Sequence, residues 1–478
     1  SHEMTDDDFR WFKHIEPEEI SLAIRKLQSK SSGHDELTVK LLQLVVEKIT
    51  IPLCHIFNVS LERCIYPNIW KTSKIIPIPK IKNPSLKDFR PISLLPIVSK
   101  LLERCIFNQL KNKLVENYGP NQYGFRSGSS SVCAMISLND FITKTMDQKD
   151  VNSVSLISLD ISKAFDTVDH SKLIRCLLNS SVPKGFTLWY MSYLTHRQQF
   201  VHFNGNNSNT ALITSGVPQG AILSPSVFCI FIASLTVQNP RNSIFKFADD
   251  TAIVIVHTNS LADEEHCRKE ILSIKNWYKN NNLKLNTDKS KRLYIKKSRV
   301  INYVCLNEIQ EVTEIKLLGV IMTNNLKWTS HINYCVKKAS RHLHLLRILR
   351  PFIKKDDLTI IYYSMIQSII DYGSQLYVGA ITNVDNEKIN KLVRRAHRII
   401  CGNECQGNCL PDQVVRRHQK SLKLFSLAIL DINHVLNSII PQRLPSGRRL
   451  NVSFTASSRA LHSFINYMTI YYNLSNRT

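Results

Sequence analysis

Acidic residues are scarce in this sequence, and it contains no long uninterrupted apolar run. Asp and Glu number 38 against 62 Lys and Arg, so the formal net charge is +24. The longest apolar stretch, Ala221 to Val237, is broken by Pro225 and several serines, and it lacks the ~20 continuous apolar residues of a membrane-spanning helix. We therefore expect no membrane insertion. The excess of cations favours nucleic acid as the partner over an anionic membrane surface or a charged surface that serves solubility alone.

The twelve cysteines form no paired framework, and no secretory signal opens the sequence. In a chain of this size, the pattern indicates reduced thiols and an intracellular protein. His397, Cys401, Cys405 and Cys409 recur at intervals of four residues. Zinc sites usually contain closer pairs such as C-x2-C, so buried or free thiols are preferred and a zinc site is the alternative. Because the chain begins with Ser1 and not Met, we expect its natural start to lie upstream.

Length and hydrophobic content predict a folded chain with several domains. The chain has 478 residues, of which 43% are hydrophobic, and two to four domains or subdomains are expected. Neither an internal repeat nor a low-complexity linker divides the sequence. We expect a helical N-terminal extension over residues 1–70, a mixed domain over 71–325, a helical domain over 326–400 and a C-terminal region of unknown role over 401–478.

Apolar periodicity predicts both helices and strands. Residues 154–160 are typical of a buried strand that ends at Asp160, and residues 244–256 predict a hairpin with Asp249 and Asp250 at its tip. Residues 315–322 predict a single further strand. Helical spacing or helix-start signals predict helices within 14–70, 98–115, 169–178, 211–237, 261–282 and 330–349.

Asp160, Asp249 and Asp250 are the candidate metal ligands. Phosphoryl transfer onto a hydroxyl uses two divalent ions ~3.5–4 Å apart, held by carboxylates. One ion activates the attacking hydroxyl and the other neutralises the leaving group. Mg²⁺ keeps several of its waters, so three aspartates suffice for two ions. Taken alone, an Asp-Asp pair between strands is more often a simple turn.

Two other features are equally ambiguous in isolation. Phe165 lies five residues after Asp160, and an aromatic ring there either excludes a 2′-hydroxyl from a nucleotide or fills the core. Gly216 to Gly220 form a turn before an apolar helix. Glycine permits close approach of the backbone to a base or sugar, but the same turn also suits an ordinary helix entry.

Together, these residues resemble the ordered motifs of reverse transcriptases, in the style of non-LTR (LINE-like, Jockey and CR1-like) retrotransposons. Eight segments match in the expected order, and they are residues 70–80, 89–104, 122–126, 159–170, 215–225, 247–251, 283–291 and 317–320. The last of these is similar to the strand that grips the primer. Ala221 stands where many relatives have Ser.

The resemblance implies an α+β fold, the right-hand polymerase. Fingers and palm, the latter an antiparallel sheet with helices, would occupy residues 71–325, and a helical thumb residues 326–400. The implied activity is RNA-directed DNA polymerisation from a 3′-hydroxyl primer at a target site, by a two-metal mechanism with Mg²⁺, for which Mn²⁺ can substitute. The implied partners are an RNA template, a DNA primer or target, dNTPs and an endonuclease domain encoded upstream. Cytoplasmic ribonucleoprotein and nucleus are the implied locations.

The resemblance also implies residue roles at the metals. Asp160, Asp249 and Asp250 would be the catalytic, metal-binding triad, and the Ile161 carbonyl would complete a metal shell. Lys289 would protonate the departing pyrophosphate, although another lysine lies two residues further on.

Further roles concern the incoming nucleotide. Lys80 and Arg90 would contact its triphosphate, Gln219 would pack against the nucleotide and the template base, and Phe165 would be the steric gate. Solvated charge is the alternative for the two cations.

Cations also favour contact with a nucleic-acid backbone. A basic cluster spans residues 279–299. The helix expected over residues 330–349 carries Lys337, Lys338 and Arg341 opposite an apolar face, so one face packs and the other can track phosphates. A solvated charged face is the alternative.

Three other functions share some of these features. An RNA-dependent RNA polymerase has a similar palm, but it needs a polar residue in place of Phe165. A non-catalytic RNA-binding protein would not require the three aspartates. A group II intron-like maturase should carry a distinct RNA-binding domain in its tail, where we also recognise no RNase H or endonuclease carboxylates.

Overall fold

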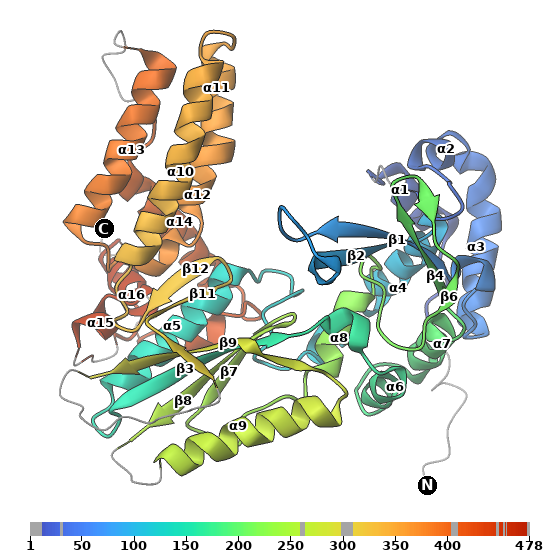
Figure 1. The fold of residues 1–478 in the computed structure, drawn as a ribbon, viewed down its shortest axis with the longest axis horizontal. Helices are drawn as coiled ribbons and strands as arrows, with labels where there is room; N and C mark the ends of the chain where they lie inside the picture. Colours follow the sequence, from blue (N-terminus) through green and yellow to red (C-terminus); the bar gives the residue numbers. More distant parts are fainter. Residues whose placement is uncertain are drawn as a thin grey trace. The chain divides into compact units, whose positions relative to one another are not determined.

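A computed structural model of the chain describes residues 12–28, 32–258, 263–297, 309–402, 410–445, 449–452, 455 and 457–475. Helices and strands are mixed along the chain, as the predicted α+β class requires (Figure 1). The chain divides into two compact units, and each unit is formed by segments that are not contiguous in the sequence. Unit 1 comprises residues 1–125, 161–236 and 273–285, and unit 2 comprises residues 126–160, 237–272 and 286–478.

Unit 1 contains most of the helices of the N-terminal half. They are α1 (Pro17–Arg25), α2 (Val39–Leu44), α3 (Val46–Glu62), α4 (Ile97–Glu116), α6 (His170–Leu178), α7 (Lys184–Leu194) and α8 (Ser224–Phe231). Pro17 and two acidic residues begin α1, an arrangement that suits the positive end of a helix dipole. Asp169 caps α6 by accepting the Lys172 N–H at 3.0 Å. The helices predicted within 14–70, 98–115 and 169–178 are confirmed.

A small sheet completes unit 1. Its strands are β1 (Thr72–Pro79), β2 (Phe89–Leu94), β4 (Gln198–Phe203), β5 (Asn206–Asn207) and β6 (Ala211–Leu212). Strand β1 pairs antiparallel with β2 and parallel with β4. Pro77 and Pro91 lie opposite each other in the β1–β2 pair, where neither can donate a ladder hydrogen bond.

The main sheet of unit 2 has the strand order β10-β9-β3-β8-β7. The strands are β3 (Ser153–Ile161), β7 (Ser243–Phe247), β8 (Asp250–His257), β9 (Leu285–Lys296) and β10 (Gln310–Val312). The hairpin predicted over 244–256 is confirmed. The sheet is antiparallel at β3, β8 and β7, but β10 runs parallel to β9. The predicted antiparallel sheet therefore holds for β3, β8 and β7, and the short edge strand β10 departs from it by pairing parallel with β9.

The single strand predicted over residues 315–322 is a hairpin. Strand β11 (Glu314–Leu317) pairs antiparallel with β12 (Val320–Thr323). Leu318 and Gly319 form the two-residue turn, with φ of 45° and 81°. Left-handed dihedrals at both positions match the twist of a tight hairpin. Because leucine seldom adopts this conformation, the apolar run gives no sign of the turn.

The remaining helices of unit 2 follow this hairpin. They are α10 (Thr329–Leu349), α11 (Lys355–Tyr362), the π-helical η5 (Tyr363–Gln367), α12 (Ser368–Asp371), the 3₁₀ helix η6 (Ser374–Tyr377), α13 (Asn383–Cys401), α14 (Gln413–Leu430), α15 (Ser458–Leu461) and α16 (Phe464–Ser475). Helices α10, α11 and α13 lie side by side (Figure 1). The helix predicted over 330–349 is confirmed.

Two longer helices precede the β11–β12 hairpin in the sequence. Helix α5 (Ser131–Asp147) packs against β7 in unit 2, and α9 (Asp263–Asn280) begins in unit 2 and ends in unit 1. Within the part of the chain that the structure describes, none of the helices is long and apolar enough to cross a membrane.

Eight cysteines of the described residues carry free thiols, in agreement with the reduced thiols expected from the sequence.

Candidate active site

Asp249 and Asp250 lie at the tip of the β7–β8 hairpin in unit 2. Phe247 pairs with Asp250, so Ala248 and Asp249 form a two-residue turn. Ala248 has a φ of 56°, a conformation that normally favours glycine at the first position of such a turn. A non-glycine residue held there stores of the order of 1 kcal/mol of strain, and such strain concentrates at functional sites.

Asp160 is at the same end of the neighbouring strand. Leu159 on β3 lies opposite Thr251 on β8, so Asp160, which follows Leu159, and Asp250, which precedes Thr251, end adjacent strands. Desolvation by the surrounding protein and the negative charges of Asp249 and Asp160 raise the pKa of Asp250 to about 6. The structure thus places the three predicted carboxylates at the same end of adjacent strands, and a bound cation would relieve the repulsion that Asp249 and Asp160 exert on Asp250.

Strand β9 places Lys289 next to this group. The Asp160 N–H donates to Ser290 Oγ at 3.4 Å, and Ser290 Oγ donates to the Asn286 carbonyl at 2.7 Å. Ser290 is buried, whereas Lys289 and Lys291 on either side of it are exposed. Since alternate residues of a strand share a face, Lys289 and Lys291 point to the same side. Strand geometry therefore does not choose between the two lysines.

The candidate nucleotide-binding residues belong to unit 1. There, the turn at Gly216 is held against the loop that follows β3. The Gly216 N–H donates to the Val168 carbonyl at 2.7 Å, and the Val217 N–H donates to the Phe165 carbonyl at 2.8 Å. These two bonds join segments about fifty residues apart in sequence.

The same turn also lies against β2. The Ser93 N–H donates to the Gln219 carbonyl at 2.8 Å, and a Cβ at Gly220 would stand 2.5 Å from the Ser93 carbonyl oxygen. Only glycine fits this approach. The backbone of the turn is therefore fixed on two sides, by the loop after β3 and by β2.

Gln219, Asp166 and Lys80 form a polar group in unit 1. Gln219 Nε2 donates to Asp166 Oδ1 at 2.8 Å. Burial raises the pKa of Asp166, although the hydrogen bond from Gln219 and the charges of Lys163 and Lys80 oppose the shift. Lys80 is exposed just after β1, and Arg90 is exposed on β2. Both predicted cations thus belong to the β1–β2 hairpin.

Phe165 is half-buried, and its ring stacks on the fully buried Phe228 of α8. The ring centroids are 4.5 Å apart and the planes differ by 20°. A partner buried on the far side restricts the rotamers of Phe165. This arrangement holds the aromatic edge in one place, as a steric gate requires.

The charged face of α10 is solvent-exposed. Lys337, Lys338 and Arg341 are exposed, while the opposite face is buried through Ile332, Cys335, Ala339, Leu343 and Leu346. None of the three cations forms an ion pair with a carboxylate among the described residues. In the basic cluster over 279–299, by contrast, Arg292 is fully buried, with Nε donating to Ser155 Oγ at 2.9 Å, and residue 299 lies outside the described residues.

Among the described residues, no group of three or more His, Cys, Asp or Glu side chains is arranged as a complete set of metal ligands. This also holds for Asp160, Asp249 and Asp250. The zinc alternative gains no support either, because His397 and Cys401 are both on α13, whereas Cys405 and Cys409 lie outside the described residues.

Sequence reasoning missed two acidic side chains that support these segments, one of them fully buried and the other half-buried. Glu103 is fully buried on α4 and accepts the N–H groups of Ile222 and Leu223 at 2.8 and 3.1 Å, just before α8 begins. Asp166 receives the Gln219 amide. Both acidic residues lie inside matched motifs, and for Glu103 the signal was a lone carboxylate in a largely apolar segment.

Comparisons with known proteins place the chain among polymerases. Residues 78–322 match the family described as reverse transcriptase (RNA-dependent DNA polymerase). The chain is 28% identical over 416 residues to the probable RNA-directed DNA polymerase from transposon BS of Drosophila melanogaster, covering 81% of this chain and 45% of that protein. It is also 28% identical over 405 residues to the RNA-directed DNA polymerase from the mobile element jockey of Drosophila melanogaster, covering 80% and 44%.

The chain therefore spans about half the length of the curated relatives it matches. Among solved structures, telomerase from Candida tropicalis is similar over 54% of each chain, with 14% identity and a TM-score of 0.38.

Proposed function

The chain belongs to the reverse transcriptase family, with relatives in Jockey-like non-LTR elements, and on this premise we propose that it copies the RNA of such an element into DNA. The resemblance drawn from the motifs is confirmed. The observation that carries the proposed chemistry is the convergence of Asp160, Asp249 and Asp250 at one end of two neighbouring strands.

We propose that these three carboxylates hold two Mg²⁺ ions, with the Ile161 carbonyl as a further ligand. The fit rests on the hard carboxylate donors and on their placement at one end of β3 and β8. Burial, together with the negative charges of Asp249 and Asp160, raises the pKa of Asp250. Bound ions supply activation of the primer 3′-hydroxyl and neutralisation of the triphosphate. The protein contributes rigid placement, because β3 and β8 fix the backbone of the aspartates and Ser290 holds the N–H of Asp160.

Lys289 would protonate the departing pyrophosphate. In unit 1, Lys80 and Arg90 would neutralise the triphosphate of a dNTP, and Gln219 would support the nucleotide through a side chain that Asp166 orients. Phe165, held by Phe228, would exclude the 2′-hydroxyl of a ribonucleotide.

The proposed substrates are an RNA template and a DNA primer whose 3′-hydroxyl comes from the target site. Lys337, Lys338 and Arg341 would track the phosphates of the template–primer duplex, since an RNA–DNA hybrid is gripped through its shape and backbone. An endonuclease domain of the same element would generate the primer. Assembly on the RNA in the cytoplasm and synthesis in the nucleus fit this scheme.

Extension of a labelled DNA primer on an RNA template tests the proposal. We expect extension with dNTPs and Mg²⁺, reduced but present extension with Mn²⁺, and none after chelation of divalent ions. Equal extension with rNTPs would indicate an RNA-dependent RNA polymerase. Binding of the RNA without any extension would indicate a non-catalytic RNA-binding protein.

A further inference from the structure

Tyr372 connects three elements of unit 2. Its hydroxyl donates to the Leu318 carbonyl, in the turn of the β11–β12 hairpin. Since a phenol has one proton, the 2.9 Å contact with Ser131 Oγ is then donated by the serine, at the start of α5. Tyr372 itself follows the end of α12. One side chain therefore ties the hairpin turn, helix α5 and the helical region together.

The fit between Tyr372 and the turn is close. A Cβ on Gly319 would stand 3.1 Å from the Tyr372 ring, and the φ of Gly319 is 81°. His331, fully buried on α10, accepts the Ile321 N–H at 3.4 Å and also hydrogen-bonds the Tyr372 backbone. The side chain of Tyr372 thus contacts the hairpin turn directly, and its backbone contacts the hairpin through His331.

The turn that Tyr372 holds lies beside a candidate metal ligand. Leu317 and Leu318 line a small pocket of unit 2 together with Phe247 and Asp250. A displacement of the turn therefore changes the wall of the pocket at Asp250. The Tyr372 hydroxyl thus holds a turn whose residues line the pocket wall beside Asp250.

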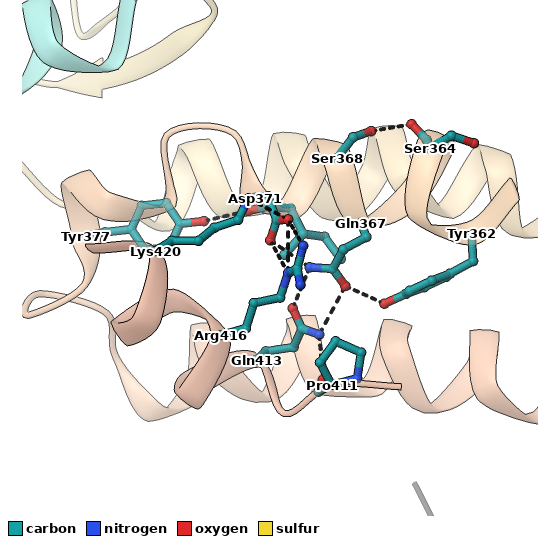
Figure 2. A network of polar contacts seen from close by, with 11 residues as sticks. Tyr362, Ser364, Gln367, Ser368, Asp371, Tyr377, Pro411, Gln413, Arg416 and Lys420 are labelled. Carbon is teal, nitrogen blue, oxygen red and sulfur yellow. Dashed lines mark hydrogen bonds and ion pairs between the residues drawn. The ribbon is translucent and has the colours of Figure 1, made fainter. Parts of the chain in front are cut away.

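Asp371, the neighbour of Tyr372, is anchored by the C-terminal region. Arg416 on α14 donates to both carboxylate oxygens through Nε at 3.0 Å and through its terminal nitrogen at 2.6 Å, while Lys420 Nζ is 2.7 Å away (Figure 2). Gln367 Nε2 donates to Asp371 Oδ1 at 2.7 Å. Burial opposes ionisation of Asp371, but these hydrogen bonds outweigh it and lower its pKa.

The network extends into the π-helical segment η5. Gln367 exchanges amide hydrogen bonds with Gln413 at 3.0 and 3.2 Å, and Tyr362 donates to Gln367 Oε1 at 2.6 Å (Figure 2). Gln367 and Gln413 are both buried. A buried, fully paired network of this kind defines one conformation, because each broken hydrogen bond leaves a desolvated polar group. The end of α12, and hence Tyr372, is thereby fixed by α14.

We propose that Tyr372 is a positioning residue for the primer end and that α14 holds it in place through Asp371 and Arg416. The inference rests on the proposed polymerase function, since it assigns to the Leu318–Gly319 turn the support of a primer 3′-hydroxyl near Asp250. It also gives the C-terminal region a role, which is to fix the placement of this turn.

Tyr372→Phe in the full chain tests the proposal, because it removes one hydroxyl and keeps the ring. We expect kcat for addition of one dNTP to fall on the order of fivefold, the factor corresponding to one hydrogen bond of ~1 kcal/mol. The KM for dNTP, the Kd for template–primer and the Tm should change little. A merely structural hydroxyl would instead lower the Tm without selective loss of kcat.

Tyr363→Phe is the matched control. Tyr363 and Tyr372 are both 39% exposed and lie in the same helical region, and removal of the Tyr363 hydroxyl leaves its ring against Arg416. If Tyr372→Phe and Tyr363→Phe give the same kcat, the proposal is overturned.

Arg416→Gln tests the link to α14, with Lys423→Gln on the same helix as the control. Arg416→Gln should lower kcat in the same direction as Tyr372→Phe. If both act through one turn, the double variant should resemble the more affected single variant. If the kcat of the double variant instead falls by the product of the two single-variant factors, the proposed connection between α14 and Tyr372 is overturned.

Hydrogen exchange separates this inference from the proposed activity. Tyr372→Phe should accelerate exchange of the amides of residues 318–321, and Tyr363→Phe should not. If the wild type extends no primer but the exchange responds, the polymerase proposal fails and the positioning interaction stands. If the wild type is active and exchange is identical in both variants, the positioning inference fails alone.

Discussion

A Cβ placed on Gly216 would stand 2.6 Å from the carbonyl oxygen of Asp166. The φ of Gly216 is 86°, so both the space and the backbone conformation require glycine. We predict that Gly216→Ala lowers the free energy of unfolding by about 2–4 kcal/mol, because the clash is with backbone that cannot move aside cheaply. Chemical denaturation of wild type and variant measures it.

Gly205→Ala provides the control for this prediction. Gly205 has a similar φ of 81° but no atom within 4 Å of the added methyl position. Gly205→Ala should therefore lower the free energy of unfolding by only about 1 kcal/mol, which is the strain of the left-handed conformation. Equal losses at Gly216 and Gly205 would show that close approach to Asp166 has no energetic consequence.

Asp249→Asn should abolish most activity without unfolding the protein. Loss of one metal ligand removes several kcal/mol of transition-state stabilisation, so single-nucleotide addition should fall ~100-fold or more. Because the three carboxylates repel each other without metal, the metal-free variant should melt at the same temperature as the wild type or slightly higher.

Thermal melts with and without MgCl₂ test whether the loss of activity in Asp249→Asn comes from the loss of a metal ligand. Ions that bind the folded state raise its Tm, and this rise should shrink in Asp249→Asn. Asp356→Asn, at an exposed aspartate in the first turn of α11, is the control. A variant with near-wild-type extension would remove Asp249 from the metal site.

The carboxylate site was predictable because local sequence patterns encode it. A strand that ends at Asp160 and a hairpin around Asp249 and Asp250 are visible as apolar runs, and the order of the motifs supplies their relation. The supporting hydrogen bonds are different. Ser290 meets the backbone of Asp160 from 130 residues away, and only the pairing of strands in three dimensions brings them together.

The Leu318–Gly319 turn and the anchoring of Asp371 were not predictable for related reasons. Leu318 adopts a left-handed φ that its side chain disfavours, so tertiary interactions and not local propensity decide the turn. Asp371 and Arg416 are 45 residues apart. Charges this common along the chain give no indication of which pair will meet.

Phe165→Val should admit ribonucleotides. The smaller side chain opens the position that the stacked ring of Phe165 occupies, so the ratio of kcat/KM for rNTP to that for dNTP should rise at least tenfold. Phe141→Val is the control, since Phe141 is a half-buried aromatic residue of α5 that packs on Phe245. An unchanged ratio with retained activity would assign the gate to another residue.

His257 should make the stability of unit 2 depend on pH. Burial, with a contribution from the positive charge of Arg292, lowers the pKa of His257 to about 3 from an ordinary 6.5. Between these values the unfolded chain binds a proton that the folded chain does not, so stability falls as the pH drops below 6.5, by ~1.4 kcal/mol per pH unit.

His257→Gln should flatten this dependence, because glutamine can keep a hydrogen bond with Ser155 Oγ, now 2.7 Å from the imidazole, and does not titrate. Denaturation curves between pH 6.5 and pH 4 measure the slope. His344→Gln, at an exposed position of α10, should leave the slope as in the wild type. An identical slope in His257→Gln would contradict the assignment.

Replacement of Lys337, Lys338 and Arg341 by Gln should weaken template–primer binding through the salt-dependent part of the affinity. For every cation that no longer neutralises a phosphate, the plot of log affinity against log salt should flatten by about one unit. The loss of affinity should be similar across sequences, because phosphates carry no sequence information. Since these side chains belong to α10 and not to the carboxylate group, processivity should fall more than addition of a single nucleotide.

A triple change at Lys40, Lys48 and Arg63, all exposed on or beside α2 and α3, removes the same charge from unit 1 and serves as the control. Titration of all three proteins against one RNA–DNA hybrid at several salt concentrations gives the slopes. If the cationic face of α10 were only solvated, its slope would match that of the control, whereas a slope lowered only in the α10 variant assigns the phosphate interactions to this helix.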